Sequence, residues 1–281
     1  MSKSNHISNE KEKELLQNLE VNYSKSKDAI WAEMEGAIEE VKESDQSKII
    51  KMGWLKYVAA IAVLLVGSVV FMRFYSVEFH TENGEFATYI LPDGSEVELN
   101  AGSTISYQPY WWSFSRGVQL DGEAFFKVEK GSQFSVHSDY GTTQVLGTSF
   151  NIYSRDNVYN VYCKTGKVKV MDLNKNQVYL EPGDFAQTTS TNIVSLEIAE
   201  AEVLSWKRGE FVYNTTPLTK VLEDFERQYS VNIEVLNKEV EKLNFTGIFE
   251  RSVIAEDAIK LVCLTFDLTF EKTDKLTYTI Y

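Results

Sequence analysis

The pattern of apolar and polar positions changes character three times along the chain and divides it into four parts. Residues 1–53 are mostly polar with one apolar stripe, and residues 54–75 are almost continuously apolar. Residues 76–200 contain short alternating runs between turn residues, whereas residues 206–281 mix such runs with stripes at helical spacing. These patterns predict, in order, an α-helical tail, one transmembrane helix, an all-β domain and a small α+β domain.

The apolar run of residues 54–75 has the composition and length of a membrane-spanning helix. No charge interrupts it between Tyr57 and Met72, and Lys56 and Arg73 stand at its ends, within reach of lipid headgroups. A helix of about 20 residues crosses a hydrocarbon core of about 30 Å. A buried globular helix would not need these basic ends, and a cleaved signal peptide would not follow so long a polar segment. Aromatic residues suited to an interfacial belt flank the run: Trp54, Tyr57, Phe74 and Tyr75.

The distribution of basic residues predicts the orientation of this helix. Beyond Arg73 the next basic residue is Arg116. The positive-inside rule therefore places the N-terminus in the cytoplasm, and in a bacterium with two membranes the rest of the chain in the periplasm. The expected location is the inner membrane, crossed once. The lysines that set this orientation are Lys42, Lys48, Lys51 and Lys56.

The tail contains an apolar stripe that has no core of its own to cover. A single helix of this length is marginally stable in water, so the stripe favours a groove on a partner protein. A helix lying on lipid is the alternative, which the acidic opposite face disfavours. The residues predicted to bind the partner are Ile30, Trp31, Met34, Ile38 and Val41, with Ala37 on the same face.

Turn signals recur every ten to twenty residues through the β region, which predicts a sandwich, barrel or solenoid. The expected turns are Pro92–Gly94, Leu120–Glu123, Lys164–Lys167 and Pro182–Asp184. Asp93, Asp121 and Asp184 are interpreted as turn formers, because Asp hydrogen-bonds its own backbone in turns.

The last seventy or so residues predict the order strand, helix, strand, strand, helix, strand, strand. Thr216 is the expected N-cap of the first helix, with Pro217 at its first position. Two strands, Val231–Val235 and Phe245–Phe249, are candidates for an exposed sheet edge that accepts an added strand.

Composition excludes several classes of function. The net charge of −13 opposes direct binding to nucleic acid. No motif for a nucleophile, a phosphate loop or a metal site occurs, so we expect no catalytic residues, cofactor or metal. Cys163 and Cys263 are interpreted as buried thiols, with a disulfide left open. An aromatic cluster could stack on sugars, although packing is the preferred interpretation: Tyr107, Tyr110, Trp111, Trp112 and Phe114.

Several motifs in one order resemble the FecR family. They are LPDGSEVELNAGSTISY, LDGEAFFKVEKGSQFSV, VLGTSFNIY, VYCKTGKVKV and YLEPGDFAQ, and the resemblance covers about Gly84 to Ala186. Residues 206–235 resemble the small C-terminal domain of Bacteroidetes-type members, and residues 26–38 resemble the family's cytoplasmic helix. The C-terminal element order is similar to the short domain, here called STN-like, at the N-termini of secretins and TonB-dependent receptors.

The resemblance implies an inner-membrane anti-sigma factor. The tail would bind an extracytoplasmic-function (ECF) sigma factor, and the periplasmic part would meet the N-terminal signalling domain of a TonB-dependent, SusC-like outer-membrane transporter. Periplasmic and intramembrane proteases would carry the signal, with Gly67 and Ser68 as a weak point in the helix. Small residues are also simply tolerated in membrane helices. The alternatives are a membrane-anchored periplasmic scaffold with an idle tail, and a tethered glycan-binding or hydrolytic β protein.

Overall fold

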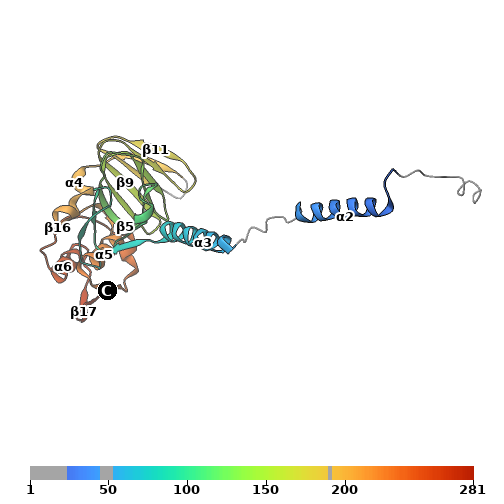
Figure 1. Cartoon of the computed structure of the whole chain (residues 1–281). Helices are drawn as coiled ribbons and strands as arrows, with labels where there is room; N and C mark the ends of the chain where they lie inside the picture. Colours follow the sequence, from blue (N-terminus) through green and yellow to red (C-terminus); the bar gives the residue numbers. More distant parts are fainter. Residues whose placement is uncertain (1–23, 45–52, 189–191) are drawn as a thin grey trace, which may run out of the picture. The chain divides into compact units, whose positions relative to one another are not determined.

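The computed structural model describes residues 24–44, 53–188 and 192–281. The chain forms two compact units, residues 1–65 and 66–281, which are described separately. Helix α2 (Lys27–Ser44) belongs to the first unit, and helix α3 (Gly53–Phe74) begins there and ends in the second (Figure 1). The other parts of the predicted tail, residues 1–23 and 45–52, lie outside the described residues.

Helix α3 contains the predicted membrane span. Its segment Trp54–Phe74 has a mean hydropathy of 2.3, and no residue of its most apolar stretch is buried in the structure. At 1.5 Å per residue the segment is about 30 Å long, which matches the apolar thickness of a bilayer. Among the described helices it is the one long and apolar enough to cross a membrane. The helix continues without a break through Gly67 and Ser68.

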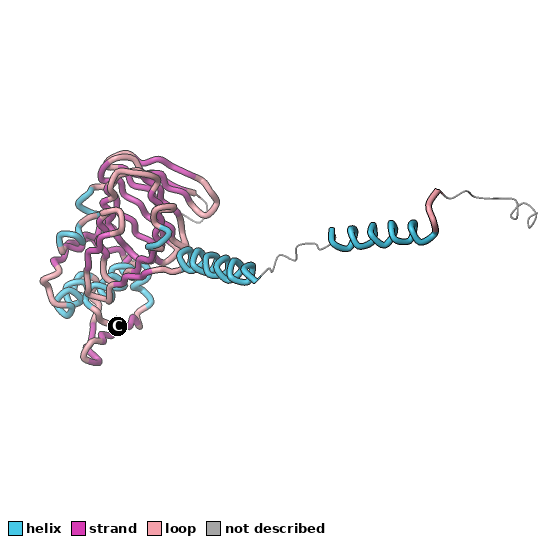
Figure 2. The backbone as a smooth tube through the Cα atoms, viewed as in Figure 1, coloured by secondary structure: helices cyan, strands magenta, loops and turns pink. Residues whose placement is uncertain are grey.

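Residues 76–200, which we call the β domain, are almost entirely strand and turn, as the turn spacing predicts. Figure 2 shows these strands gathered into one curved body. A single 3-10 turn, η1 (Pro109–Trp111), interrupts them within the described residues before α4 (Glu200–Val203). The strands are β1 (Val77–His80), β2 (Ala87–Ile90), β3 (Glu96–Leu99), β4 (Thr104–Tyr107), β5 (Arg116–Lys127), β6 (Phe134–His137), β7 (Thr142–Val145), β8 (Ser149–Arg155), β9 (Val158–Thr165), β10 (Val168–Met171), β11 (Gln177–Leu180), β12 (Asp184–Thr188) and β13 (Ile193–Glu197).

The long strand β5 organises this domain. Its first half pairs with β4 and, in parallel, with β6, and its second half pairs with β3 and β8. Strands β7, β10 and β11 extend the sheet on one side, and β9, β12 and β13 extend it on the other. The result is a 13-stranded sheet that curls into a nearly closed barrel. The all-β prediction is confirmed.

The predicted turn at Leu120–Glu123 is wrong, because these residues lie inside β5. Asp121 pairs with Thr104 in a regular antiparallel ladder and forms no turn. Gly122 has φ +113, a conformation that favours glycine, and it stands where β5 passes from one half of the sheet to the other. The Asp-Gly pair therefore marks a bend within a strand. Asp93 does lie in a turn, where its carboxylate accepts the backbone N–H of Ser95 at 3.0 Å.

The two halves of the sheet enclose one apolar core. Phe126 of β5 stacks on Phe150 of β8 at 5.1 Å between ring centroids, and meets Phe134 of β6 edge-on at 6.2 Å. All three rings are fully buried, and each contributes about 1.5–3 kcal/mol by leaving water. Their burial fixes which face of each strand points inward.

Residues 206–281, which we call the C-terminal domain, have a second core and the predicted element order. Strand β14 pairs with β16, and β18 pairs with β15 in parallel and with β17 in antiparallel fashion. Helices α5 and α6 supply buried residues to the same core. The elements are η2 (Ser205–Arg208), β14 (Glu210–Pro217), α5 (Leu218–Tyr229), β15 (Asn232–Val235), η3 (Lys238–Lys242), β16 (Asn244–Glu250), α6 (Ala255–Thr265), β17 (Phe270–Asp274) and β18 (Thr277–Ile280).

The predicted start of α5 is displaced by one position. Thr216 remains in β14, where it pairs with Phe245, so it does not cap the helix. Pro217 takes the N-cap position without a side-chain hydrogen bond, and Leu218 is the first helical residue. Ladder pairing with β16 therefore prevails over the capping preference of threonine.

Candidate functional sites

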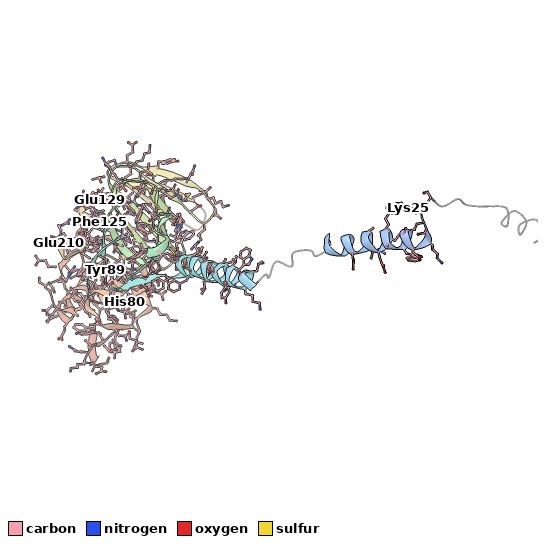
Figure 3. All side chains as sticks on the ribbon, in the orientation of Figure 1. Lys25, His80, Tyr89, Phe125, Glu129 and Glu210 are labelled. Carbon is pink, nitrogen blue, oxygen red and sulfur yellow. The ribbon has the colours of Figure 1, made fainter. Side chains whose placement is uncertain are left out.

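The first candidate site is the apolar stripe of α2. Trp31, Met34 and Ile38 are 57%, 48% and 51% exposed, and Ile30 is half-buried. Figure 3 shows side chains pointing outward along α2, which follows the labelled Lys25. Val41 belongs to the same helix, but its side chain lies outside the described part of the chain.

The side-chain ion pair of α2 among the described residues is local to its own segment. The ion pair between Lys25 and Glu33, at 2.6 Å, stays within this segment. Three large apolar side chains in water on one helix face are costly, since each buried CH₂ is worth about 0.8 kcal/mol. The face is therefore suited to a partner's groove.

The second candidate site is the junction between the β domain and the C-terminal domain. An apolar seam buries Leu204 and Trp206 against Phe125, Tyr162 and Phe185 of the β domain. Leu204 and Trp206 belong to residues 201–209, which join the two domains and are called the linker below. The side chains that make this seam are far apart in the sequence, and local patterning does not predict that they meet.

Cations cover the rim of this seam. The ammonium of Lys207 lies 3.4 Å from the centroid of the Phe125 ring and 2.8 Å from the carboxylate of Glu98. The guanidinium of Arg251 lies 3.4 Å from the Phe86 ring and donates to the carbonyl of Trp206 at 3.1 Å. Cation–π contacts of this kind contribute about 0.5–2 kcal/mol each. They connect the linker, the β domain and the turn that follows β16.

Two hydrogen bonds join α5 to the loops of the β domain. Gln228 donates from Nε2 to Oδ1 of Asn100 at 3.1 Å, and the N–H of Gly84 donates to the carbonyl of Arg227 at 2.7 Å. Both lie beside a cavity of about 320 Å³ between the domains. The C-terminal end of α5 is thus fixed to the β domain by polar contacts, and the linker by apolar ones.

Charged side chains meet inside this cavity. Glu123 of β5 accepts hydrogen bonds from Nδ2 of Asn100 at 2.7 Å and Nδ2 of Asn151 at 2.9 Å. Desolvation raises the pKa of Glu123 above its ordinary value, while the two amides and Arg155 oppose the rise. Sequence reasoning missed this site because Glu123 was assigned to a turn.

Asp224 of α5 forms an ion pair with Arg227 in the same cavity. Desolvation raises its pKa as well, against the opposing effect of Arg227. The one sequence signal is a carboxylate placed directly before the buried Phe225. Charged and amide side chains that line a cavity favour contact with water over dry apolar packing at this part of the junction.

The remaining residues highlighted by the sequence pack into the fold or lie at its surface. Cys163 and Cys263 are buried free thiols, and burial raises the pKa of each to about 11. Trp112 is buried against Tyr107 and Phe134, whereas Phe114 is exposed. No group of His, Cys, Asp or Glu side chains in the described residues could hold a metal ion.

Comparison with known proteins agrees with this organisation. The family model described as FecR protein matches residues 77–169, and the model described as FecR, C-terminal, matches residues 210–280. A search of curated proteins found no match.

Two solved structures from Parabacteroides distasonis, each described as a candidate anti-sigma factor, are similar. The first, at 2.50 Å resolution, is 28% identical with a TM-score of 0.67, and the match covers 74% of this chain and 99% of that one. The second, at 1.65 Å, is also 28% identical with a TM-score of 0.66, covering 73% and 98%. With two family models matched in order and neighbours of this kind, the chain belongs to the FecR family.

Proposed function

We propose that this protein is a single-pass inner-membrane anti-sigma factor whose α2 helix binds an ECF sigma factor in the cytoplasm. Membership of the FecR family and the neighbours described as anti-sigma factors support the regulatory role. The observation that carries the binding site is the exposed stripe Trp31, Met34 and Ile38 on a helix with no core of its own. Proposed boundaries are residues 1–53 for the tail, 54–75 for the span, 76–200 for the β domain and 206–281 for the STN-like domain.

The stripe is tested by placing charge on it. Trp31→Asp with Met34→Asp removes two apolar anchors, each worth about 2 kcal/mol or more in a buried interface. The matched control is Ala29→Asp with Ala32→Asp, which adds the same charge to the other face of the helix. Full-length protein and sigma factor are co-purified from membranes, and transcription from a sigma-dependent promoter is measured.

We expect the stripe variant to lose co-purification and the control to retain it. Transcription should change with the stripe variant alone. It rises if the tail only inhibits and falls if the tail also activates. A stripe variant that still binds the sigma factor and leaves transcription unchanged would favour the scaffold alternative.

The lysine asymmetry supports a cytoplasmic N-terminus, so the β and C-terminal domains are proposed to be periplasmic. There the signalling domain of a TonB-dependent, SusC-like transporter would add a strand to β15 or β16. Among the described strands, each of these two pairs on one side only, and Ile248 of β16 is 67% exposed. Ile248→Lys in β16 and Val235→Lys in β15, tested separately, should identify which strand accepts the transporter's strand. The variant in that strand should lose the response to inducer.

Release of the sigma factor is proposed to follow periplasmic and then intramembrane proteolysis, with Gly67 and Ser68 as the weak point. A Cβ at Gly67 would meet nothing within 4 Å, so Gly67→Ala fits the helix. It should strengthen the helix by about 0.8–1 kcal/mol and slow the intramembrane cut. Immunoblotting of membranes after induction follows the accumulation of the uncut fragment. Unchanged cleavage would place the weak point elsewhere.

A further inference from the structure

The aromatic turn between β4 and β5 packs against the end of α3. The ring of Tyr110 lies 6.1 Å from that of Phe71 and 5.4 Å from that of Tyr75. Arg73 donates to Gln108 at 3.2 Å, and its guanidinium lies 5.6 Å from the Trp111 ring. The turn and the last helical turn of α3 therefore lie side by side.

One side chain of the turn is buried in the core of the β domain, and other rings of the turn stay exposed. Trp112 points into the core, where it meets Phe134 edge-on at 5.9 Å. Tyr110 is 51% exposed and Phe114 is 74% exposed, and the Trp111 and Phe114 rings are 4.8 Å apart. Two exposed aromatic side chains, Tyr110 and Phe114, and the half-buried Trp111 between them are thus presented to the surroundings on a short, anchored turn.

The position of α3 indicates what these exposed rings contact. Phe71 belongs to the apolar run, and Arg73 and Tyr75 mark the boundary at which that run ends. Rings within about 6 Å of these residues lie at the depth of the headgroups if α3 spans a bilayer. Tyr and Trp favour this depth because one part of the ring is apolar and the other polar.

Strand register places further apolar and basic side chains at the end of the sheet where β5 begins. Arg116, which begins β5, pairs with Phe134, and Phe134 pairs with Val145 at the end of β7. Leu146, the next residue, is exposed and lines a shallow depression with Lys130, Lys167 and Lys169. Basic side chains near a membrane surface favour anionic headgroups by about 1 kcal/mol each.

These lysines are unusual in an acidic region. Residues 76–281 contain 18 basic and 30 acidic residues. Lys167 has a partner in Glu181, but at 4.0 Å and with both side chains mostly exposed the pair is weak. A local excess of basic charge beside exposed aromatic rings is what a lipid headgroup layer attracts.

We propose that residues 109–114, together with Leu146 and the lysines around it, form a membrane-docking surface. Its partner is the phospholipid headgroup layer of the bilayer that α3 crosses. The β domain then rests on the membrane and does not swing freely on its helix. This inference depends on the proposed membrane span of α3 but not on the sigma factor.

The test uses the full-length protein in nanodiscs containing phosphatidylglycerol, with a spin label at Phe114→Cys and, separately, at Ser113→Cys. Both positions are exposed, so labelling leaves the core intact. The native cysteines are buried, which disfavours their labelling. Accessibility to oxygen and to a water-soluble nickel complex is compared with two references, Val63→Cys in α3 and Lys242→Cys in η3.

We expect the label at residue 114 or 113 to show a several-fold loss of nickel accessibility relative to residue 242, with oxygen accessibility raised toward that of residue 63. Equal nickel accessibility at 113, 114 and 242, with residue 63 still protected, overturns the docking surface and leaves the span intact. A water-exposed label at residue 63 overturns the span and the docking surface together.

Discussion

Arg116 illustrates how one buried charge organises a β turn. Its guanidinium forms an ion pair with Asp93 and donates to the carbonyls of Ser132 at 2.7 Å and Glu129 at 2.9 Å. The Phe134 ring lies 5.5 Å from it. Asp93 therefore has two roles, as turn former and as the counter-charge of a side chain that is 8% exposed.

Asp93→Ala should destabilise the β domain by about 3–5 kcal/mol, because it leaves a buried guanidinium without its carboxylate. Asp93→Asn removes the same charge but keeps an acceptor for the backbone N–H of Ser95, so the difference between the two variants measures the turn hydrogen bond alone. Chemical unfolding followed by tryptophan fluorescence measures both. A loss below about 1 kcal/mol for Asp93→Ala would mean that water replaces the carboxylate.

The raised pKa of Glu123 makes the stability of the folded protein depend on pH. Its pKa is higher in the folded than in the unfolded chain, so the folded state binds the proton more tightly. Its stabilising contribution is present below the unfolded pKa of about 4.3 and is lost as the pH rises through the folded value. Asp224 shifts in the same direction.

Glu123→Gln should therefore stabilise the protein at neutral pH and flatten its stability profile above about pH 4.3. Asn151 can turn its amide so that Oδ1, which has no protein partner among the described residues, accepts from the new amide. Unfolding midpoints across this pH range compare variant and wild type. If the unfolding midpoints of variant and wild type change in parallel with pH, the pKa of Glu123 does not differ between the folded and unfolded states.

At the scale of elements, β5 explains most of what the sequence pattern could and could not predict. The helix α2, the span α3 and the alternation of the strands follow from local periodicity, and the order of the C-terminal elements does too. The sequence predicts a turn at Asp121-Gly122, because the local signal for a turn and for a bend in a strand is the same. The junction that joins Glu123 to Asp224 depends on contacts a hundred positions apart, which periodicity does not encode.

Gly122→Ala should destabilise the β domain by at least about 1–3 kcal/mol. The new Cβ would lie 2.6 Å from Cβ of Ser103, at a φ of +113. Gly117→Ala in the same strand is the matched control, because its Cβ would meet nothing closer than Oγ of Ser115 at 3.6 Å. Thermal unfolding of both variants measures the difference. Equal melting temperatures would mean that the bend in β5 adapts to a side chain.

At the scale of the whole molecule, the β domain and the C-terminal domain form one compact unit within residues 66–281. Trp206 is central to that unit, since its ring is buried in the seam and its carbonyl accepts from Arg251 and from the N–H of Gly209. A signal received at a sheet edge of the C-terminal domain would reach the β domain through such contacts. Rigidity at the seam is therefore a requirement of the proposed transduction.

Trp206→Ala should uncouple the two domains while leaving each core folded. Removing the indole costs about 3–5 kcal/mol, and the whole cost falls on the seam because the residue belongs to neither main core. Limited proteolysis of the full chain should then cut between residues 198 and 209, where the wild type resists. Trp31→Ala, which removes an exposed indole from α2, is the control and should leave this cleavage pattern unchanged. If Trp206→Ala also resists cleavage there, the polar contacts of Gln228 and Gly84 suffice to hold the domains together, and the seam is not what transmits the signal.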